Sequence, residues 1–108
     1  MDIVKINVTK EDIKRGKRKD SDHCPVALAA RRDLNLPEDC QVSVGRLFVG
    51  ISSPRGSTSF DLPAYATEFI DEFDRAEKVG PIGFVIRPDD VVRLKKVVDT
   101  KEKINNIQ

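Results

Sequence analysis

The sequence predicts a small α+β domain, in which a mostly antiparallel sheet of about four strands carries two to three helices packed on one face. Three observations lead to this fold class. Short β-branched stretches alternate between apolar and polar positions, as half-buried strands do. One longer stretch carries apolar residues at helical spacing. Turn residues separate these stretches, and 108 residues is the usual length of one domain.

The first strand and the first helix are predicted at the start of the chain. Residues 3–8 form the strand, because apolar side chains recur there at period two. These side chains are Val4, Ile6 and Val8. Thr9 and Asp12 have the spacing of a capping box, which predicts a short helix over Lys10–Arg15. Gly16 closes this helix as a left-handed cap, and a polar loop follows.

The stretch S-D-H-C-P-V-A-L-A-A-R-R over residues 21–32 predicts the second helix. Pro25 suits the first turn, where its missing N–H needs no partner. The residue before a proline is driven out of the helical region, so Cys24 is expected at the N-cap. The helix runs to about Leu34, and residues 35–37 end it.

Two further strands are predicted over residues 40–44 and 47–51, because both stretches alternate. Gly45-Arg46 forms the tight hairpin turn between them. Residues 52–59, S-S-P-R-G-S-T-S, are rich in turn formers and predict a mobile loop. Phe60 then resumes a short strand.

The clearest helix is predicted over Asp61–Ala76. Its apolar stripe consists of Ala66, Phe69, Ile70 and Phe73, at helical spacing. Residues 82–86 form the fourth strand. Residues 88–98 predict a last helix that begins at Pro88-Asp89-Asp90. Residues 1–99 are therefore predicted as a single domain, and residues 100–108 as a frayed C-terminal tail.

The composition narrows the class of protein. Apolar residues make up 39% of the chain and charged residues 34%, as in a soluble globular protein. A net charge of +1, no tryptophan and one tyrosine argue against general affinity for nucleic acid. No apolar run reaches the length of a membrane span, and the first residues lack the pattern of a signal peptide. A cytoplasmic location is expected, with Cys24 and Cys40 as free thiols.

Two kinds of site chemistry are weighed around His23-Cys24. A helix start and an imidazolium both lower the pKa of a thiol, as a nucleophilic cysteine requires. His23 is the single histidine, so we favour a structural Cys24 that caps the helix. A metal site from His23, Cys24 and Cys40 lacks the short ligand spacing of structural zinc. We therefore expect no catalytic residue, no metal and no cofactor.

Two charged segments are the candidate binding residues. The basic loop consists of Lys14, Arg15, Lys17, Arg18 and Lys19, and Arg31, Arg32 and Arg46 could extend it. The acidic helix face consists of Glu68, Asp71, Glu72 and Asp74. The alternative for each segment is an ordinary solvated surface.

Three stretches together carry a resemblance. They are T-K-E-D-I-K-R-G (Thr9–Gly16), C-P-V-A-L-A (Cys24–Ala29) and L-P-A-Y-A-T-E-F-I-D-E-F-D (Leu62–Asp74), which leads on to P-I-G-F-V-I (Pro81–Ile86). The chain resembles, over residues 3–86, a group of small uncharacterised proteins of bacteriophages, prophages and their bacterial hosts. The resemblance implies a phage-type accessory protein and supplies no activity and no catalytic residues.

Three functions are therefore weighed. The first is a small non-enzymatic protein that binds and inhibits or modulates a host protein, such as an anti-defence factor of the anti-CRISPR kind. Its partner would be a nucleic-acid-handling or defence complex. The second is a nucleic-acid or nucleotide-binding module that uses the basic loop 14–19. The third is a cysteine-dependent enzyme at Cys24. No membrane partner is expected.

Overall fold

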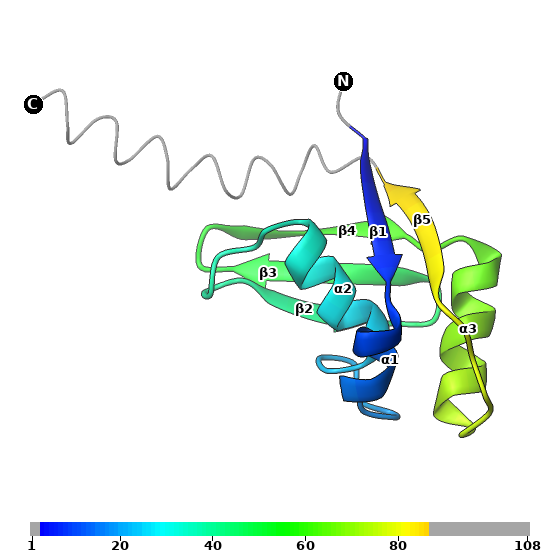
Figure 1. Ribbon diagram of the computed structural model, residues 1–108. Coiled ribbons are helices and arrows are strands. Elements are labelled where there is room, and N and C mark those ends of the chain that lie inside the picture. The colour runs from blue at the N-terminus through cyan, green and yellow to red at the C-terminus, as the bar shows by residue number, and fades with distance from the viewer. Residues whose placement is uncertain (1–2, 87–108) are drawn as a thin grey trace, which may run out of the picture.

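The structure, a computed structural model, describes residues 3–86 (Figure 1). In chain order the elements are β1 (Val4–Val8), α1 (Lys10–Arg15), α2 (Pro25–Asp33), β2 (Gln41–Val44), β3 (Phe48–Ser53), β4 (Gly56–Asp61), α3 (Ala64–Asp74) and β5 (Ile82–Ile86). The predicted α+β class is confirmed, and every strand pairing among these elements is antiparallel. The helix predicted from Pro88 and the tail predicted from residue 100 lie outside the described residues.

The strands form two sheets, a two-stranded sheet β1–β5 and a three-stranded sheet β2–β3–β4. In the first sheet the two ends of the described chain meet, with Val4 opposite Ile86 and Val8 opposite Ile82. Figure 1 shows β1 and β5 crossing in front of the three-stranded sheet, with α2 lying over that sheet and α3 beside β5. Sequence patterns indicate strands but do not divide them between sheets, because that division depends on pairing between distant residues.

The prediction of a mobile loop over residues 52–59 is wrong. The structure continues β3 to Ser53, turns at Pro54-Arg55 and returns as β4, with Ser53 opposite Gly56. An ion pair fixes the turn, because both guanidinium nitrogens Nη1 and Nη2 of Arg55 lie 2.7 Å from the Asp39 carboxylate. Serines on the open face of β4 lack the apolar alternation that marks a strand in the sequence.

The helices and the inner faces of the sheets enclose one core. The stripe predicted for α3 is confirmed, because Ala66, Phe69, Ile70 and Phe73 are all buried. Burial of each large apolar side chain stabilises the fold by about 1.5 to 3 kcal/mol. In α2, Ala27, Ala29 and Ala30 are buried, and their small size lets the helix pack closely. Cys24 is its N-cap, as predicted.

The first helix begins as predicted and ends differently. Thr9 and Asp12 form both hydrogen bonds of a capping box. Gly16 is not a left-handed cap, because its φ of −68° and ψ of 153° are those of extended backbone. A side chain at this position would place Cβ 2.5 Å from Cδ of Pro25. Gly16 is therefore required by the close approach of the two segments and not by its dihedral angles.

The other two helices end in left-handed residues that are not glycine. Asn35 follows α2 with φ of 53°, and Ala76 follows α3 with φ of 65°. After α3, the N–H of Ala76 donates to the Phe73 carbonyl and that of Glu77 to the Glu72 carbonyl, which is the Schellman pattern. The turn between β2 and β3 occupies Gly45–Leu47, one residue longer than predicted.

Candidate binding surface

The segment between α1 and α2 is an ordered loop over residues 16–24. Its ends are joined by the N–H of Lys17, which donates to the His23 carbonyl at 2.9 Å. Inside the loop, Asp20 Oδ1 accepts hydrogen bonds from the N–H groups of Asp22 and His23, both at 3.0 Å. His23 Nδ1 lies 3.1 Å from the same oxygen. Asp20 therefore organises the loop, and the histidine ring is one of its partners.

The loop is also attached to the end of α3. The N–H of Lys19, a residue with φ of 56°, donates to Asp74 Oδ1 at 2.9 Å. The guanidinium carbon of Arg18 lies 5.9 Å from the centre of the Phe73 ring, within range of a cation–π contact. The predicted basic loop and the predicted acidic helix face therefore adjoin each other, although they are far apart in the sequence.

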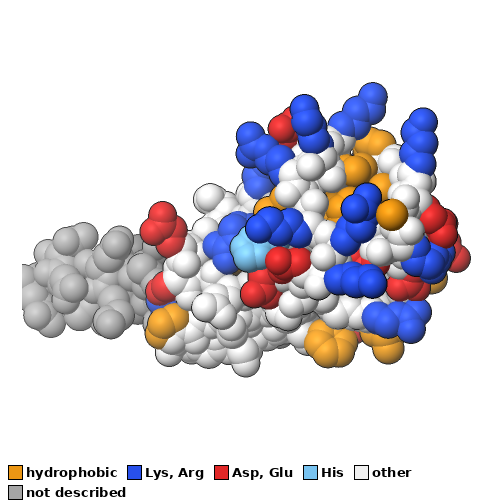
Figure 2. All heavy atoms as spheres, turned by 90° about the horizontal axis from the view of Figure 1, so that it is seen from below, with side chains coloured by type: hydrophobic (Ala, Val, Ile, Leu, Met, Phe, Trp, Pro, Cys, Tyr) orange, Lys and Arg blue, Asp and Glu red, His pale blue; other side chains and the backbone are white. Residues whose placement is uncertain are grey.

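The cations of this region differ in whether a carboxylate neutralises them. Arg15 pairs with Glu11 at 3.1 Å, and Arg46 pairs with Asp71 at 3.0 Å. Five cations of the predicted basic loop and of α2 form no ion pair with any carboxylate within residues 3–86, and we name these five the basic surface. They are Lys14, Lys17, Arg18, Lys19 and Arg31. Figure 2 shows lysine and arginine side chains crowding the face seen from the α1 end.

A groove of about 530 Å³ lies within this face, between α1 and α2. Lys17, His23 and Arg31 line it, together with Leu28 and the ion pairs Arg15–Glu11 and Arg32–Asp12. Arg31 is held in place by the carbonyls of Pro37 and Cys40, which accept hydrogen bonds from Nη1 and Nη2. Carbonyls orient the guanidinium without cancelling its charge, so Arg31 remains a fixed cation in the groove.

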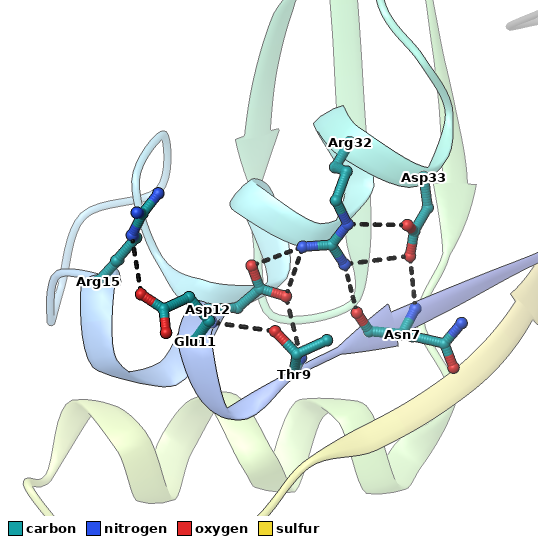
Figure 3. A network of polar contacts seen from close by, with 7 residues as sticks. All are labelled: Asn7, Thr9, Glu11, Asp12, Arg15, Arg32 and Asp33. Atoms are coloured by element: carbon teal, nitrogen blue, oxygen red, sulfur yellow. Dashed lines mark hydrogen bonds and ion pairs between the residues drawn. The ribbon is translucent and has the colours of Figure 1, made fainter.

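Arg32, which the sequence placed in the same patch, is part of a structural network (Figure 3). Its Nη1 donates to Asp12 Oδ1 at 2.8 Å, and its Nη2 donates to the Asn7 carbonyl at 2.6 Å. Its Nε donates to Asp33 Oδ1 at 3.0 Å. The network joins β1, α1 and α2 and uses the positive charge of Arg32 internally.

Asp12 is the buried member of this network, with its side chain only 7% exposed. Burial alone would raise the pKa of Asp12, but the hydrogen bonds from Arg32 and Thr9 outweigh it and lower the pKa below the usual value. The carboxylate thus stays charged at neutral pH. The capping box made Asp12 recognisable in the sequence, whereas its pairing with Arg32, twenty positions away, left no local pattern.

The acidic helix face is divided by its intramolecular contacts. Asp71 pairs with Arg46, and Asp74 accepts the hydrogen bond from Lys19. Glu68 and Glu72 form no side-chain hydrogen bond or ion pair within the described part of the chain, although the charge of Glu72 lies near enough to act on Arg75. Only half of the predicted carboxylates are therefore available in full to an outside partner.

Cys24 and Cys40 are free and buried thiols. Burial raises the pKa of the Cys24 thiol, whereas a nucleophilic cysteine requires a lowered one. The ring of the neighbouring His23 is engaged by Asp20. Residues 3–86 contain no group of three or more His, Cys, Asp or Glu side chains that could hold a metal ion. No helix over these residues is long and apolar enough to span a membrane.

The chain matches no family model, no curated protein and no solved structure.

Proposed function

We propose that this protein is a small non-enzymatic binding protein that modulates or inhibits a host protein, and that the basic surface is its contact region. The observation that carries the proposal is the set of unpaired cations of the basic surface, two of which, Lys17 and Arg31, line the groove between α1 and α2. Cations that are neither paired nor buried favour association with a partner of opposite charge.

The way the basic surface is held supports the same proposal. Asp20 shapes the loop from inside, and Asp74 and Phe73 attach it to α3. A loop held in one conformation loses less entropy on binding than a free one. The partner surface proposed is therefore acidic. Glu68 and Glu72 are placed second as contact residues, because the other two carboxylates of the acidic helix face are engaged within the molecule.

The nature of the host protein is proposed from the resemblance of residues 3–86 to small phage and prophage proteins. Such a context favours an anti-defence role, in which the partner is a nucleic-acid-handling or defence complex of a bacterial host, as for an anti-CRISPR protein. The protein would then act in the host cytoplasm. In this proposal inhibition follows from occupying the partner's surface, so it needs no catalytic group.

A second candidate function is direct binding of nucleic acid through the same cations, since Lys and Arg side chains contact phosphates without regard to sequence. Lys17 and Arg31 in the groove favour it. The described surface around them offers no tryptophan for stacking with bases, and the net charge of the chain is +1. A cysteine-dependent enzyme is third, because the thiol of Cys24 is buried.

The test compares two charge-reversal variants. Lys17→Glu with Lys19→Glu changes the basic surface, and Lys5→Glu with Lys78→Glu makes the same change of net charge elsewhere on the exposed surface. Each protein is immobilised and exposed to nuclease-treated bacterial lysate, and captured proteins are identified by mass spectrometry. We expect one host protein to be retained by the wild type and by the control pair, and lost with the first pair.

Two results would overturn the proposal. Retention of the same host protein by the Lys17 and Lys19 variant would exclude the basic surface as the contact region. Capture from an untreated lysate but not from the nuclease-treated one, together with wild-type binding of labelled DNA or RNA that weakens steeply with salt, would replace the first candidate by the second.

A further inference from the structure

Side chains bind outward-facing backbone groups on both edges of the β1–β5 sheet. At β1, the N–H of Asn7 donates to Asp33 Oδ2 at 2.7 Å, and the Asn7 carbonyl accepts from Arg32. At β5, the Gly83 carbonyl accepts from the Tyr65 hydroxyl at 2.8 Å. On each edge, one residue thus has an outward-facing backbone group that is bound by a side chain, Asn7 on β1 and Gly83 on β5. Natural proteins protect exposed sheet edges in this manner, because open edges pair with other chains.

The direction of the backbone groups in β4 follows from its ladder with β3. The N–H of Leu62 donates to the Leu47 carbonyl at 2.9 Å, which extends the β3–β4 ladder by one residue. Successive residues of an antiparallel strand alternate between facing the partner strand and facing away. Phe60 therefore faces β3 like Leu62. The N–H and C=O groups of Ser57, Ser59 and Asp61 face away from it.

The edges of the three-stranded sheet differ from each other. At β2, the N–H of Val44 donates to the Ser21 carbonyl at 2.9 Å. At β4, no hydrogen bond to the backbone groups of Ser57, Ser59 or Asp61 comes from any residue within 3–86. These three residues are also exposed. They carry no lysine, proline or bulge of the kind that usually blocks an open edge.

We propose that the edge of β4 pairs with β4 of a second copy of this chain. The strands run antiparallel about a two-fold axis at Ser59. Ser59 then lies opposite Ser59 of the second copy, and Ser57 lies opposite Asp61 of the second copy. Each of these pairs exchanges two backbone hydrogen bonds, and the two three-stranded sheets become one continuous sheet.

The sequence of β4 favours a second copy in this register. All three outward-facing residues find a partner, whereas a shift by one pair in either direction leaves an end unpaired. Each Asp61 carboxylate faces a Ser57 hydroxyl, which can donate to it, and no two like charges meet.

The test measures self-association of the full chain by sedimentation equilibrium. One strand pair buries less surface than a standard interface, so we expect a dimer with a dissociation constant in roughly the micromolar to millimolar range. Ser59→Lys places two ammonium groups opposite each other and should weaken the dimer by about tenfold or more. Ser43→Lys is the matched control, because Ser43 is exposed on the same cross-strand row at the opposite edge, β2. It should dimerise like the wild type.

A second measurement does not depend on how Ser59→Lys folds. Ser59→Cys should form a disulfide-linked dimer under mild oxidation, because opposite residues of an antiparallel pair lie within disulfide reach. Ser43→Cys should not, and the native cysteines are buried. A monomer at every concentration overturns the proposal. Equal dimerisation of the two lysine variants, or equal cross-linking of the two cysteine variants, overturns it as well.

Discussion

The backbone N–H of Lys19 donates to Asp74 Oδ1 at 2.9 Å and so attaches the loop over residues 16–24 to the end of α3. The contact joins residues 55 positions apart. It holds Lys19 at a positive φ, which a residue with a side chain adopts at some cost. The Asp74 carboxylate thus helps to hold the loop, with its cations, in place, together with Asp20 inside the loop.

Removal of this carboxylate should loosen the loop without unfolding the protein. We expect Asp74→Ala to lower the free energy of unfolding by about 1 kcal/mol, as for loss of one partly exposed hydrogen bond. Hydrogen exchange at the Lys19 amide should become faster. Glu68→Ala, on the same helix, is the control and should change neither quantity beyond about 0.5 kcal/mol. Unchanged exchange at Lys19 in Asp74→Ala would contradict the assigned role.

Gly16→Ala should lower the free energy of unfolding, because the added methyl group would overlap Pro25. The backbone dihedral angles of Gly16 suit alanine. The Cβ of Gly16→Ala would lie 2.5 Å from Pro25 Cδ and 2.6 Å from Pro25 Cγ, so α1 and α2 must separate. We expect the free energy of unfolding, measured by urea denaturation, to fall by about 2 to 3 kcal/mol. Gly80→Ala meets nothing within 4 Å and should be neutral to within about 0.5 kcal/mol. Similar stability of the two variants would refute the contact.

The left-handed residue after α3 offers a stabilising substitution. Ala76 adopts φ of 65°, where a Cβ is unfavourable and glycine is not. Ala76→Gly should therefore raise the free energy of unfolding by about 0.5 to 1 kcal/mol, after allowing for the greater freedom of glycine in the unfolded chain. Asn35→Gly, at the equivalent position after α2, should change little, because asparagine already tolerates this conformation. Thermal or urea denaturation decides, and destabilisation by Ala76→Gly would be the contrary outcome.

Asp12 should make the stability of the protein depend on acid pH. Its folded pKa is lower than the ordinary value of 3.8, so the folded state favours the charged form. The stabilisation is therefore complete above that value and is lost as the pH falls through the lowered pKa. Asp12→Asn should cost about 2 to 3 kcal/mol at pH 7, since it leaves Arg32 without its buried partner.

The pH dependence of this stability difference tests whether the charge of Asp12 is its cause. In urea denaturation at decreasing pH, the difference in stability between wild type and Asp12→Asn should shrink below pH 3.8. A difference that stays constant between neutral pH and about pH 2.5 would show that the charge of Asp12 contributes nothing.

The thiols of Cys24 and Cys40 should react only slowly with alkylating reagents in the folded protein. Burial raises the pKa of Cys24 and shields it from reagents, so iodoacetamide should react at a rate set by unfolding. Reaction should be rapid in concentrated urea and slow without it, and Cys24→Ser identifies which thiol reacts. Rapid alkylation of native Cys24 at neutral pH would instead support a cysteine nucleophile.

Local patterns in the sequence determined most of the elements. The capping box at Thr9 and Asp12, the proline that opens α2 and the apolar stripe of α3 act over one or two helical turns, so each could be recognised without a partner segment. Alternation likewise indicated β1, β2 and β3. The basic loop and the acidic helix face were recognisable by charge alone.

Tertiary structure decided what depends on residues far apart in the chain. β4 pairs with β3, although its serines give no apolar alternation in the sequence. Gly16 packs closely against Pro25 and does not form a left-handed cap. Arg32 and Asp74 form contacts within the molecule, with Asp12 and with the N–H of Lys19. Lys17 and Arg31 line the groove without a carboxylate partner among residues 3–86. The sequence states which charges exist, but only the packing of distant segments determines which of them are neutralised.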